Sequence, residues 1–244
     1  GDFQLDPNSL HIRPRRKFML IALPNTDKSF TCTLFMPNEG DISFESLQSN
    51  PDVINFFQTY FPDILPLLDN FPNSFFSNHT GKLGTIYSDN WYYNKTLIIG
   101  DAAHAIVPFF GQGMNASFED CEVLIDTLDK NNNDFKITFS KFNSSRIPDA
   151  NAIAKMAIEN YIEMRDSVSK NEFLKKKKIE NLLFKHFPDK FIPRYNMVSF
   201  SSIPYSEVYN RGEIQDEIIN NIDIDNFDLE YAEKLINSKL ISIS

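Results

Sequence analysis

The sequence of 244 residues predicts an α/β fold of the α+β kind, and three stretches carry that prediction. Two apolar runs on either side of a turn over 11–37 indicate an antiparallel hairpin. A short apolar run at 96–99 indicates a strand that leads into a glycine-flanked loop and a helix. Apolar residues at helical spacing over 151–168 indicate a long amphipathic helix. We expect three domains, which span residues 1–85, 86–148 and 149–244.

Composition, charge and missing motifs exclude several classes of function for this chain. The net charge of −9 argues against a nucleic-acid partner, because such partners select basic surfaces. No stretch of the sequence approaches the roughly 18 apolar residues of a membrane span, and no N-terminal signal is visible. Cys32 and Cys121 each lie in an apolar pattern, which predicts reduced, buried thiols. The eight glycines form no G-x-S-x-G, no P-loop and no strand-coupled G-x-G-x-x-G.

The hairpin comes first along the chain, with strands at 18–23 and 30–36. Alternation places the more apolar side chains of the second strand on one face and Thr31, Thr33 and Phe35 on the other. Two small hydroxyls beside a phenyl ring would suit a wall for a polar aromatic ligand. The same pattern also describes a half-buried sheet face, so both interpretations stay open.

Two segments without assigned chemistry follow. Residues 44–68 have a helical pattern that Pro62 and Pro66 interrupt. Residues 70–94 have the turn residues and short apolar runs of loop and edge-strand structure.

The apolar run at 96–99 predicts a strand that is covered on both faces. Open α/β sheets bind ligands just beyond the carboxyl ends of their strands, which is where Asp101 lies. An ionised carboxylate only accepts hydrogen bonds, so its natural partner is a ligand hydroxyl, such as that of a ribityl or ribose group.

A helix is predicted to begin near Asn115. We expect it to bury an apolar stripe that consists of Phe118, Cys121, Leu124, Ile125 and Leu128. Its first N–H groups lack partners inside the helix, and the helix dipole makes that end electropositive. Gly111 and Gly113 allow the backbone to come close to a flat or anionic group. The pyrimidine edge of a flavin is such a group.

Other interpretations of this stretch are weaker. Gly111-x-Gly113-x-x-Ala116 matches a relaxed dinucleotide fingerprint, but Pro108 and other loop residues separate it from the strand. Asp101 and His104 could form a metal pair, but no third ligand stands at a suitable spacing. We therefore expect no metal site and interpret His104 as a structural histidine.

The predicted helix at 151–168 carries one anomaly. Its stripe consists of Ile153, Met156, Ala157, Asn160, Met164 and Val168. A buried amide such as that of Asn160 needs partners, so it is either satisfied by neighbouring backbone or holds a ligand. Further amphipathic helices are predicted at 172–187, with Lys175–Lys178 as a solvated face, and at 229–236.

The run Gly-Asp-Ala-Ala-His-Ala-Ile-Val-Pro-Phe-Phe-Gly-Gln-Gly-Met-Asn-Ala, residues 100–116, resembles the second flavin motif of the class A flavoprotein aromatic hydroxylases. Within them it is most similar to the kynurenine hydroxylase family. The hairpin at 10–37, Asn160–Arg165 and Phe191–Phe200 resemble the same family. The resemblance extends from about residue 10 to about residue 208.

The resemblance implies a fold that contains part of a Rossmann-like FAD-binding domain, a substrate domain with an antiparallel or mixed sheet, and a C-terminal helical region. It implies FAD as cofactor, NADPH as co-substrate, and hydroxylation of L-kynurenine by dioxygen through a flavin C4a-hydroperoxide, with no catalytic side chain because the flavin carries the chemistry. The implied FAD ligands are Asp101, Gly111, Gln112, Gly113, Met114 and Asn115. The implied substrate-binding residues are Thr33, Phe35, Pro108, Phe109, Phe110, Asn160, Met164 and Tyr195.

The sequence departs from the family pattern in three respects. The family's N-terminal dinucleotide-binding unit and its C-terminal membrane helix have no counterpart here, and Ser117 stands where the family commonly has glycine. We therefore expect a C-terminal portion that needs an N-terminal part for activity, from a full-length protein on the cytosolic face of the mitochondrial outer membrane. The alternatives are another class A flavin hydroxylase or epoxidase, and a non-catalytic flavin-fold fragment.

Overall fold

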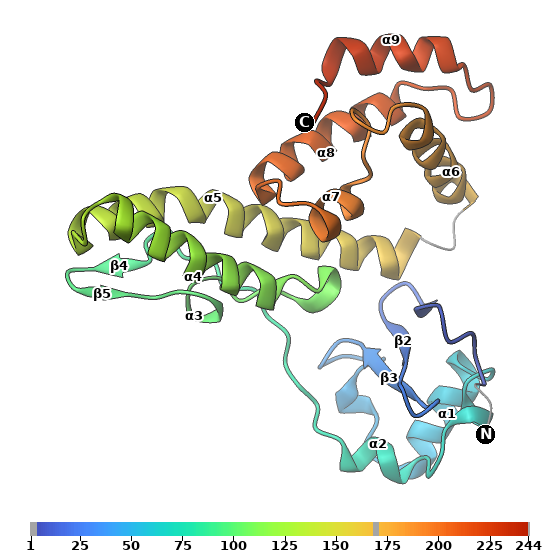
Figure 1. Ribbon diagram of the computed structural model, residues 1–244. Coiled ribbons are helices and arrows are strands. Elements are labelled where there is room, and N and C mark those ends of the chain that lie inside the picture. The colour runs from blue at the N-terminus through green and yellow to red at the C-terminus, as the bar shows by residue number, and fades with distance from the viewer. Residues whose placement is uncertain (1–3, 168–170, 244) are drawn as a thin grey trace. The chain divides into compact units, whose positions relative to one another are not determined.

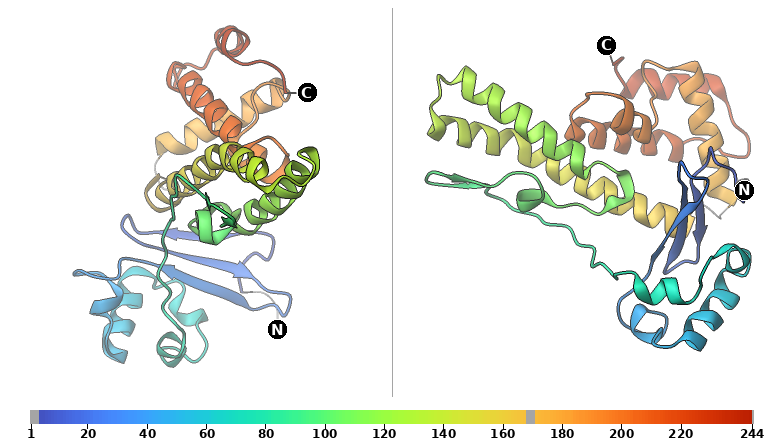
Figure 2. Two further views of the ribbon diagram at one scale, coloured as in Figure 1. Left: turned by 90° about the vertical axis from the view of Figure 1, so that its left-hand side faces the viewer. Right: turned by 60° about the horizontal axis from the view of Figure 1, so that its bottom comes forward.

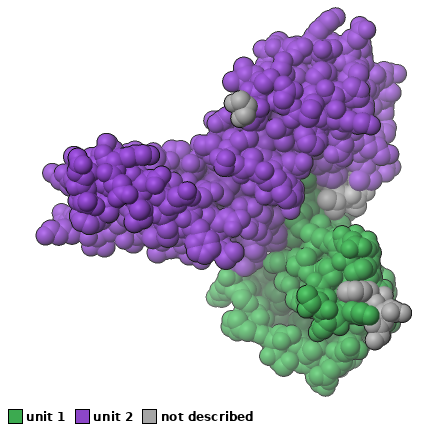
Figure 3. All heavy atoms as spheres, viewed as in Figure 1, with its two compact units in different colours: residues 1–82, 162–169 green, residues 83–161, 170–244 purple. Residues whose placement is uncertain are grey.

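The computed structural model describes residues 4–167 and 171–243, which fall into two compact units (Figure 3). Unit 1 consists of residues 1–82 and 162–169, and unit 2 of residues 83–161 and 170–244. The three predicted domains stay a prediction. Residue 148, at one of their boundaries, lies inside a helix of unit 2.

Unit 1 contains an antiparallel sheet of β1 (His11–Pro14), β2 (Met19–Pro24) and β3 (Phe30–Phe35), in the order β1-β2-β3 (Figure 1). The predicted hairpin is confirmed by β2 and β3. Ile21 lies opposite Thr33 and Met19 opposite Phe35, so the mixed face of β3 continues across β2. The strand β1 adds an edge that the sequence pattern did not separate.

Short helical segments complete unit 1. They are η1 (Phe44–Ser46), α1 (Asn50–Tyr60), η2 (Leu65–Leu67), α2 (Asn73–Ser77) and a π-helical turn, η4 (Glu163–Ser167). A capping box between Ser49 and Asp52 starts α1. Its buried Phe56 and Phe57 pack with Phe18 and neighbouring apolar residues of the sheet. This core makes unit 1 a small α+β body.

Unit 2 is mostly helical and begins with a short hairpin. Its elements are β4 (Tyr92–Tyr93), β5 (Thr96–Leu97), α3 (Asp101–His104), η3 (Pro108–Phe110), α4 (Gly113–Lys130), α5 (Phe135–Ile162), α6 (Asn171–His186), α7 (Arg194–Phe200), α8 (Tyr205–Asn220) and α9 (Leu229–Lys239). The helices α4 and α5 run side by side in all views (Figures 1 and 2).

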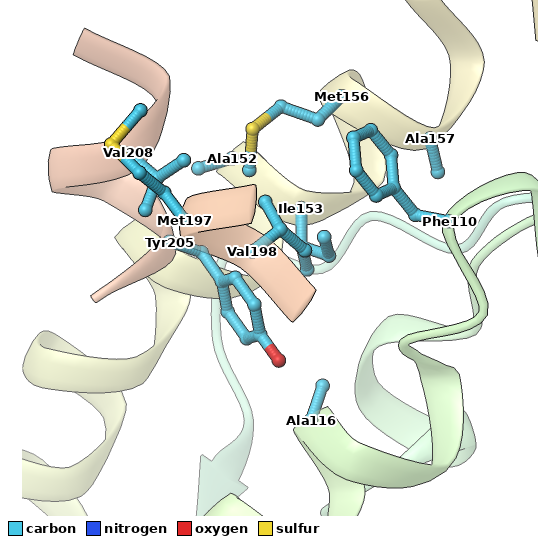
Figure 4. Close-up of a cluster of buried hydrophobic side chains, with 10 residues drawn as sticks. All are labelled: Phe110, Ala116, Ala152, Ile153, Met156, Ala157, Met197, Val198, Tyr205 and Val208. Carbon is cyan, nitrogen blue, oxygen red and sulfur yellow. The ribbon is translucent and has the colours of Figure 1, made fainter. Parts of the chain in front are cut away.

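Two apolar cores hold the helices of unit 2 together. One joins η3 and α4 to α5, α7 and α8, and its buried members are Phe110, Ala116, Ala152, Ile153, Met156, Ala157, Met197, Val198, Tyr205 and Val208 (Figure 4). The other joins α6, α8 and α9 around residues such as Leu183, Ile218 and Ile236. The first core holds the loop before α4 in place through Phe110.

Two predictions about unit 2 are wrong in detail. The strand at 96–99 is a two-residue strand, β5, paired antiparallel with β4 and only partly buried. No other described strand lies beside it, so it lacks the neighbours that would cover both faces. The stripe of α4 is only partly buried, since Phe118 is 65% exposed and Ile125 and Cys121 are exposed, while Leu124 and Leu128 are half-buried. The buried residues of α4 are instead Ala116 and Asp120, on another face.

The cysteines and the long helix also differ from expectation. Cys32 and Cys121 are free, as predicted, but exposed rather than buried. The helix predicted to begin at Asn151 begins at Phe135, because Pro148 is accommodated inside α5 rather than ending it. Val168, the last residue of the predicted stripe, lies outside the described residues. No helix in the described parts of the chain is long and apolar enough to cross a membrane.

Candidate functional site

The turn before α3 holds Gly100 in a backbone conformation that favours glycine. Its φ is +59° and its ψ is −143°, and a Cβ at this position would lie 3.1 Å from the Ser117 hydroxyl. Its carbonyl accepts hydrogen bonds from the N–H groups of Ala103 and His104, at 2.8 and 2.9 Å. Asp101 follows directly, and its exposed carboxylate accepts no hydrogen bond from the described residues. The turn therefore presents a carboxylate that is placed by backbone alone.

The helix α4 begins with an uncapped N-terminus. Gln112 is its N-cap residue, but the Gln112 side chain does not cap the helix. Its Oε1 accepts hydrogen bonds from Nδ2 of Asn115 at 2.9 Å and from the Tyr205 hydroxyl at 3.2 Å. Within the described residues, no group accepts a hydrogen bond from the N–H of Gly113, Met114 or Asn115. Three donors at the electropositive end of a helix are thus available to a ligand.

The loop before α4 leaves room beside these donors. Gly111 has a φ of +68°, and a Cβ there would meet no atom within 4 Å. The first turn of α4 contains no acidic residue that would repel an acceptor. Open N–H donors fit the acceptor-rich edge of a flavin, and the exposed Asp101 fits a ligand hydroxyl. The residues proposed as FAD ligands, Asp101 and 111–115, therefore fit that cofactor chemically.

A buried carboxylate, Asp120, links the Gly100 turn to α4 by hydrogen bonds. Its side chain is 0% exposed. Oδ2 accepts a hydrogen bond from the Gly100 N–H at 2.9 Å and lies 2.5 Å from Nε2 of His104. Oδ1 accepts one from Nε of Arg146 at 2.8 Å. Burial opposes ionisation of Asp120, but the hydrogen bonds from His104, Gly100 and Arg146 outweigh it and hold the pKa of this carboxyl below its ordinary value of 3.8.

Arg146 of α5 is the cation of this buried network. Its Nη2 also donates to the Ala116 carbonyl at 3.3 Å and lies 3.2 Å from the Glu119 carboxylate. Its Nη1 lies 3.5 Å from the Asp149 carboxylate. One buried guanidinium therefore joins two successive turns of α4 to α5.

His104 is a buried, hydrogen-bonded structural histidine, as the sequence indicated. Its ring stacks on Trp91, with centroids 4.9 Å apart and planes 29° from parallel. The Trp91 indole N–H donates to the Ser88 carbonyl at 3.1 Å. Among the residues that the structure describes, no group of three His, Cys, Asp or Glu side chains could hold a metal ion.

The loop that contains η3 is held from two sides by aromatic and amide groups. Nδ2 of Asn160 donates to the Phe109 carbonyl at 2.7 Å. The Phe109 ring stacks on Tyr161, with centroids 4.4 Å apart, and Phe110 stacks on Tyr195 at 5.9 Å. Neighbouring backbone is therefore one partner of the Asn160 amide, the first of the two interpretations that the sequence left open.

Unit 2 brings together most of the residues that sequence reasoning selected. These are Asp101, Pro108, Phe109, Phe110, Gly111, Gln112, Gly113, Met114, Asn115, Asn160 and Tyr195. The other three, Thr33, Phe35 and Met164, belong to unit 1. Thr33 and Phe35 share one face of β3, as alternation predicts, and Met164 lies in η4. Their role in substrate binding stays a prediction.

Sequence reasoning missed Asp120, Arg146 and Tyr205, which hold the site together. Asp120 lies one helical turn after the buried Ala116. This spacing places both residues on one face of α4, and it was the sequence signal that could have indicated burial of Asp120. Figure 4 shows the Tyr205 hydroxyl directed toward the first turn of α4. Burial, together with the nearby Glu119 carboxylate, raises the pKa of Tyr205 and keeps its hydroxyl protonated to donate to Gln112.

Comparisons with known proteins point to one family. Residues 68–133 match a family model described as FAD binding domain. The chain is 46% identical over 238 residues to a kynurenine 3-monooxygenase of Cytophaga hutchinsonii. The aligned residues make up 97% of this chain and 53% of that protein. The chain is 48% identical over 223 residues to that of Sus scrofa, covering 90% of this chain and 47% of the relative. For Dictyostelium discoideum the identity is 43% over 258 residues, with 98% and 56% covered.

The similarity thus extends over nearly all of this chain, while the chain spans only about half the length of these relatives. The segment that matches the FAD binding domain contains the Gly100 turn and the uncapped start of α4. The chain belongs to the kynurenine 3-monooxygenase family of flavoproteins.

Proposed function

We propose that this chain, together with the portion of its relatives that it does not span, forms a flavin-dependent monooxygenase. The proposed reaction is the hydroxylation of L-kynurenine to 3-hydroxykynurenine with NADPH and dioxygen. The observation that carries the proposal is the uncapped start of α4 beside the Gly100–Asp101 turn, in a chain 46% identical to a kynurenine 3-monooxygenase. The expected placement of the full-length protein on the mitochondrial outer membrane stays a prediction.

FAD, when bound, would supply the NADPH-dependent activation of dioxygen that hydroxylates the ring. The residues of this chain bind and orient. The N–H groups of Gly113, Met114 and Asn115 would hold the acceptor edge of the flavin, and their dipole would stabilise negative charge that develops there. Asp101 would accept a hydrogen bond from a hydroxyl of the ribityl chain.

The loop around η3 would form the apolar wall between cofactor and substrate. Phe110 is buried in the core and Phe109 stacks on Tyr161, so both rings are fixed rather than free. Fixed aromatic rings would exclude water from the reacting groups. Asn160 donates to the Phe109 carbonyl, and Tyr195 stacks on Phe110. We propose that Asn160 and Tyr195 also bind the amino-acid end of kynurenine.

The test is to reconstitute activity from two polypeptides. This chain is co-expressed with the portion of the Cytophaga hutchinsonii relative that it does not span, and the matching half of that relative serves as the positive control. We expect a yellow complex that oxidises NADPH in a kynurenine-dependent manner and releases 3-hydroxykynurenine. This chain alone is expected to bind FAD weakly and to turn nothing over.

The outcomes separate the alternatives. If the control pair is active and the complex with this chain contains no flavin, the chain is a non-catalytic relative and the proposal is wrong. If the complex contains flavin but kynurenine neither stimulates NADPH oxidation nor is hydroxylated, the chain belongs to a hydroxylase or epoxidase for another substrate.

A further inference from the structure

Asp120 connects the two parts of the proposed FAD site, the start of α4 and the Gly100–Asp101 turn. Its side chain is buried, so it lies behind the proposed cofactor ligands and is not one of them. It lies on α4, whose start supplies the open N–H groups. Through Oδ2 it accepts the N–H of Gly100, the residue before Asp101, and contacts His104 at the end of α3. Its Oδ1 is occupied by Arg146, so each carboxylate oxygen has an assigned partner.

Hydrogen bonds hold both backbone groups of Gly100, its N–H and its carbonyl. The carbonyl of Gly100 is held by the N–H groups of Ala103 and His104, and its N–H is held by Asp120. The Asp101 side chain has no hydrogen bond of its own among the described residues, so its direction depends on the Gly100 backbone. Gly100, which has a φ of +59°, carries no Cβ, so its backbone would be free to move without such restraints.

We propose that Asp120 is a positioning residue for the flavin, which sets the direction of Asp101 relative to the N–H groups at the start of α4. The inference rests on the proposed function. A carboxylate in this place acts on cofactor affinity through Gly100, and not only on the stability of the fold. A purely structural role would lower stability but leave the affinity of the folded protein for FAD unchanged.

The chain offers a matched control in the neighbouring carboxylate. Glu119 also lies near Arg146, at 3.2 Å, but its side chain is 43% exposed and it contacts neither Gly100 nor His104. Asp120→Asn and Glu119→Gln therefore each remove one negative charge beside the same guanidinium. Only Asp120→Asn disturbs the turn.

The measurement is the dissociation constant of FAD, from flavin fluorescence, in the reconstituted complex at a temperature where circular dichroism shows each variant folded. We expect Asp120→Asn to weaken FAD binding about tenfold or more, and Glu119→Gln to change it less than about twofold. In the Asp101→Asn background, Asp120→Asn should have little further effect, because both act on the same contact. An unchanged dissociation constant in folded Asp120→Asn, or additive effects of the two substitutions, contradicts the proposal.

A second variant and a second readout cover the case in which Asp120→Asn does not fold. His104→Gln retains the Asp120–Arg146 pair and removes one contact of Oδ2, and a smaller loss of FAD affinity is expected. Hydrogen exchange of the Gly100 amide in this chain, without any cofactor, should become faster in His104→Gln than in Glu119→Gln. If both quantities match those of Glu119→Gln, Asp120 does not position the turn. A wild-type complex that binds no FAD at all would instead refute the proposed function.

Discussion

Replacing Arg146 by alanine is expected to lower the free energy of unfolding by about 3–5 kcal/mol. The variant leaves Asp120 buried without its cation, and it removes the link from α5 to the Ala116 carbonyl of α4. Chemical denaturation of the isolated chain measures the loss. Lys141→Ala is the control on the same helix, because Lys141 is exposed and bonds only Asn131 among the described residues. It should change stability by no more than about 0.5 kcal/mol.

The change of stability with pH is a second test of the Asp120–Arg146 contact, and its direction can be predicted. The pKa of Asp120 is below its ordinary value in the folded chain, so the stability it contributes is present above about pH 3.8 and is lost as the pH falls further. Without Arg146 the carboxyl loses one of the hydrogen bonds that depress its pKa. Arg146→Ala should therefore lose less stability on acidification than the wild type, and equal losses would show that Asp120 is not the titrating group.

Replacing Asn160 by alanine is expected to raise the KM for kynurenine about tenfold or more in the reconstituted complex. The substitution removes the hydrogen bond to the Phe109 carbonyl and the amide that we assign to the amino-acid end of the substrate. The dissociation constant of FAD should stay within about twofold, since Asn160 bonds the Phe109 carbonyl, which precedes the proposed flavin ligands 111–115 in the chain. Steady-state kinetics at saturating NADPH measure the effect.

The control for Asn160 is an asparagine on the same helix. Asn151 is exposed on α5, and Asn151→Ala should leave both constants unchanged. Asn160→Asp distinguishes the two contacts of the amide, because a carboxylate cannot donate to the Phe109 carbonyl. A KM for kynurenine that is unaltered in Asn160→Ala would contradict the assignment of Asn160 to the substrate site.

Local sequence patterns predicted those parts of the fold that depend on local chemistry. The hairpin of β2 and β3 follows from two apolar runs, the second of them alternating, on either side of a turn. The helical pattern over 44–68 contains α1, and Pro62 lies just beyond the end of that helix. The start of α4 was predicted within two residues, because Gly111 and Gly113 mark the loop and an apolar period follows. These features need no knowledge of distant segments.

The errors arose where distant segments decide the outcome. The stripe of α4 has the right period, but a helix buries the face that another element covers, and here that face contains Ala116 and Asp120. The run at 96–99 is apolar enough for a central strand, but within the described residues only β4 pairs with it. The exposed Cys121 lies on the same uncovered face.

The candidate site was predictable where the residues form one contiguous motif and not where they are brought together by folding. The segment 101–115 was identified from its order of residue types. Asp120 and Arg146 are 26 positions apart, and their charges favour a solvated assignment for each when taken alone. Only the packing of α4 against α5 turns them into a buried pair beside the Gly100–Asp101 turn.

We propose that the open N–H groups at the start of α4, with Asp101, hold the flavin. Amide chemical shifts test it most directly, because only this chain of the two-polypeptide complex needs to be isotopically labelled. We expect FAD to shift the amides of Gly113, Met114 and Asn115 and those around Asp101 more than the rest of the chain. Binding of FAD that leaves these amides unshifted, with the changes elsewhere, would contradict it.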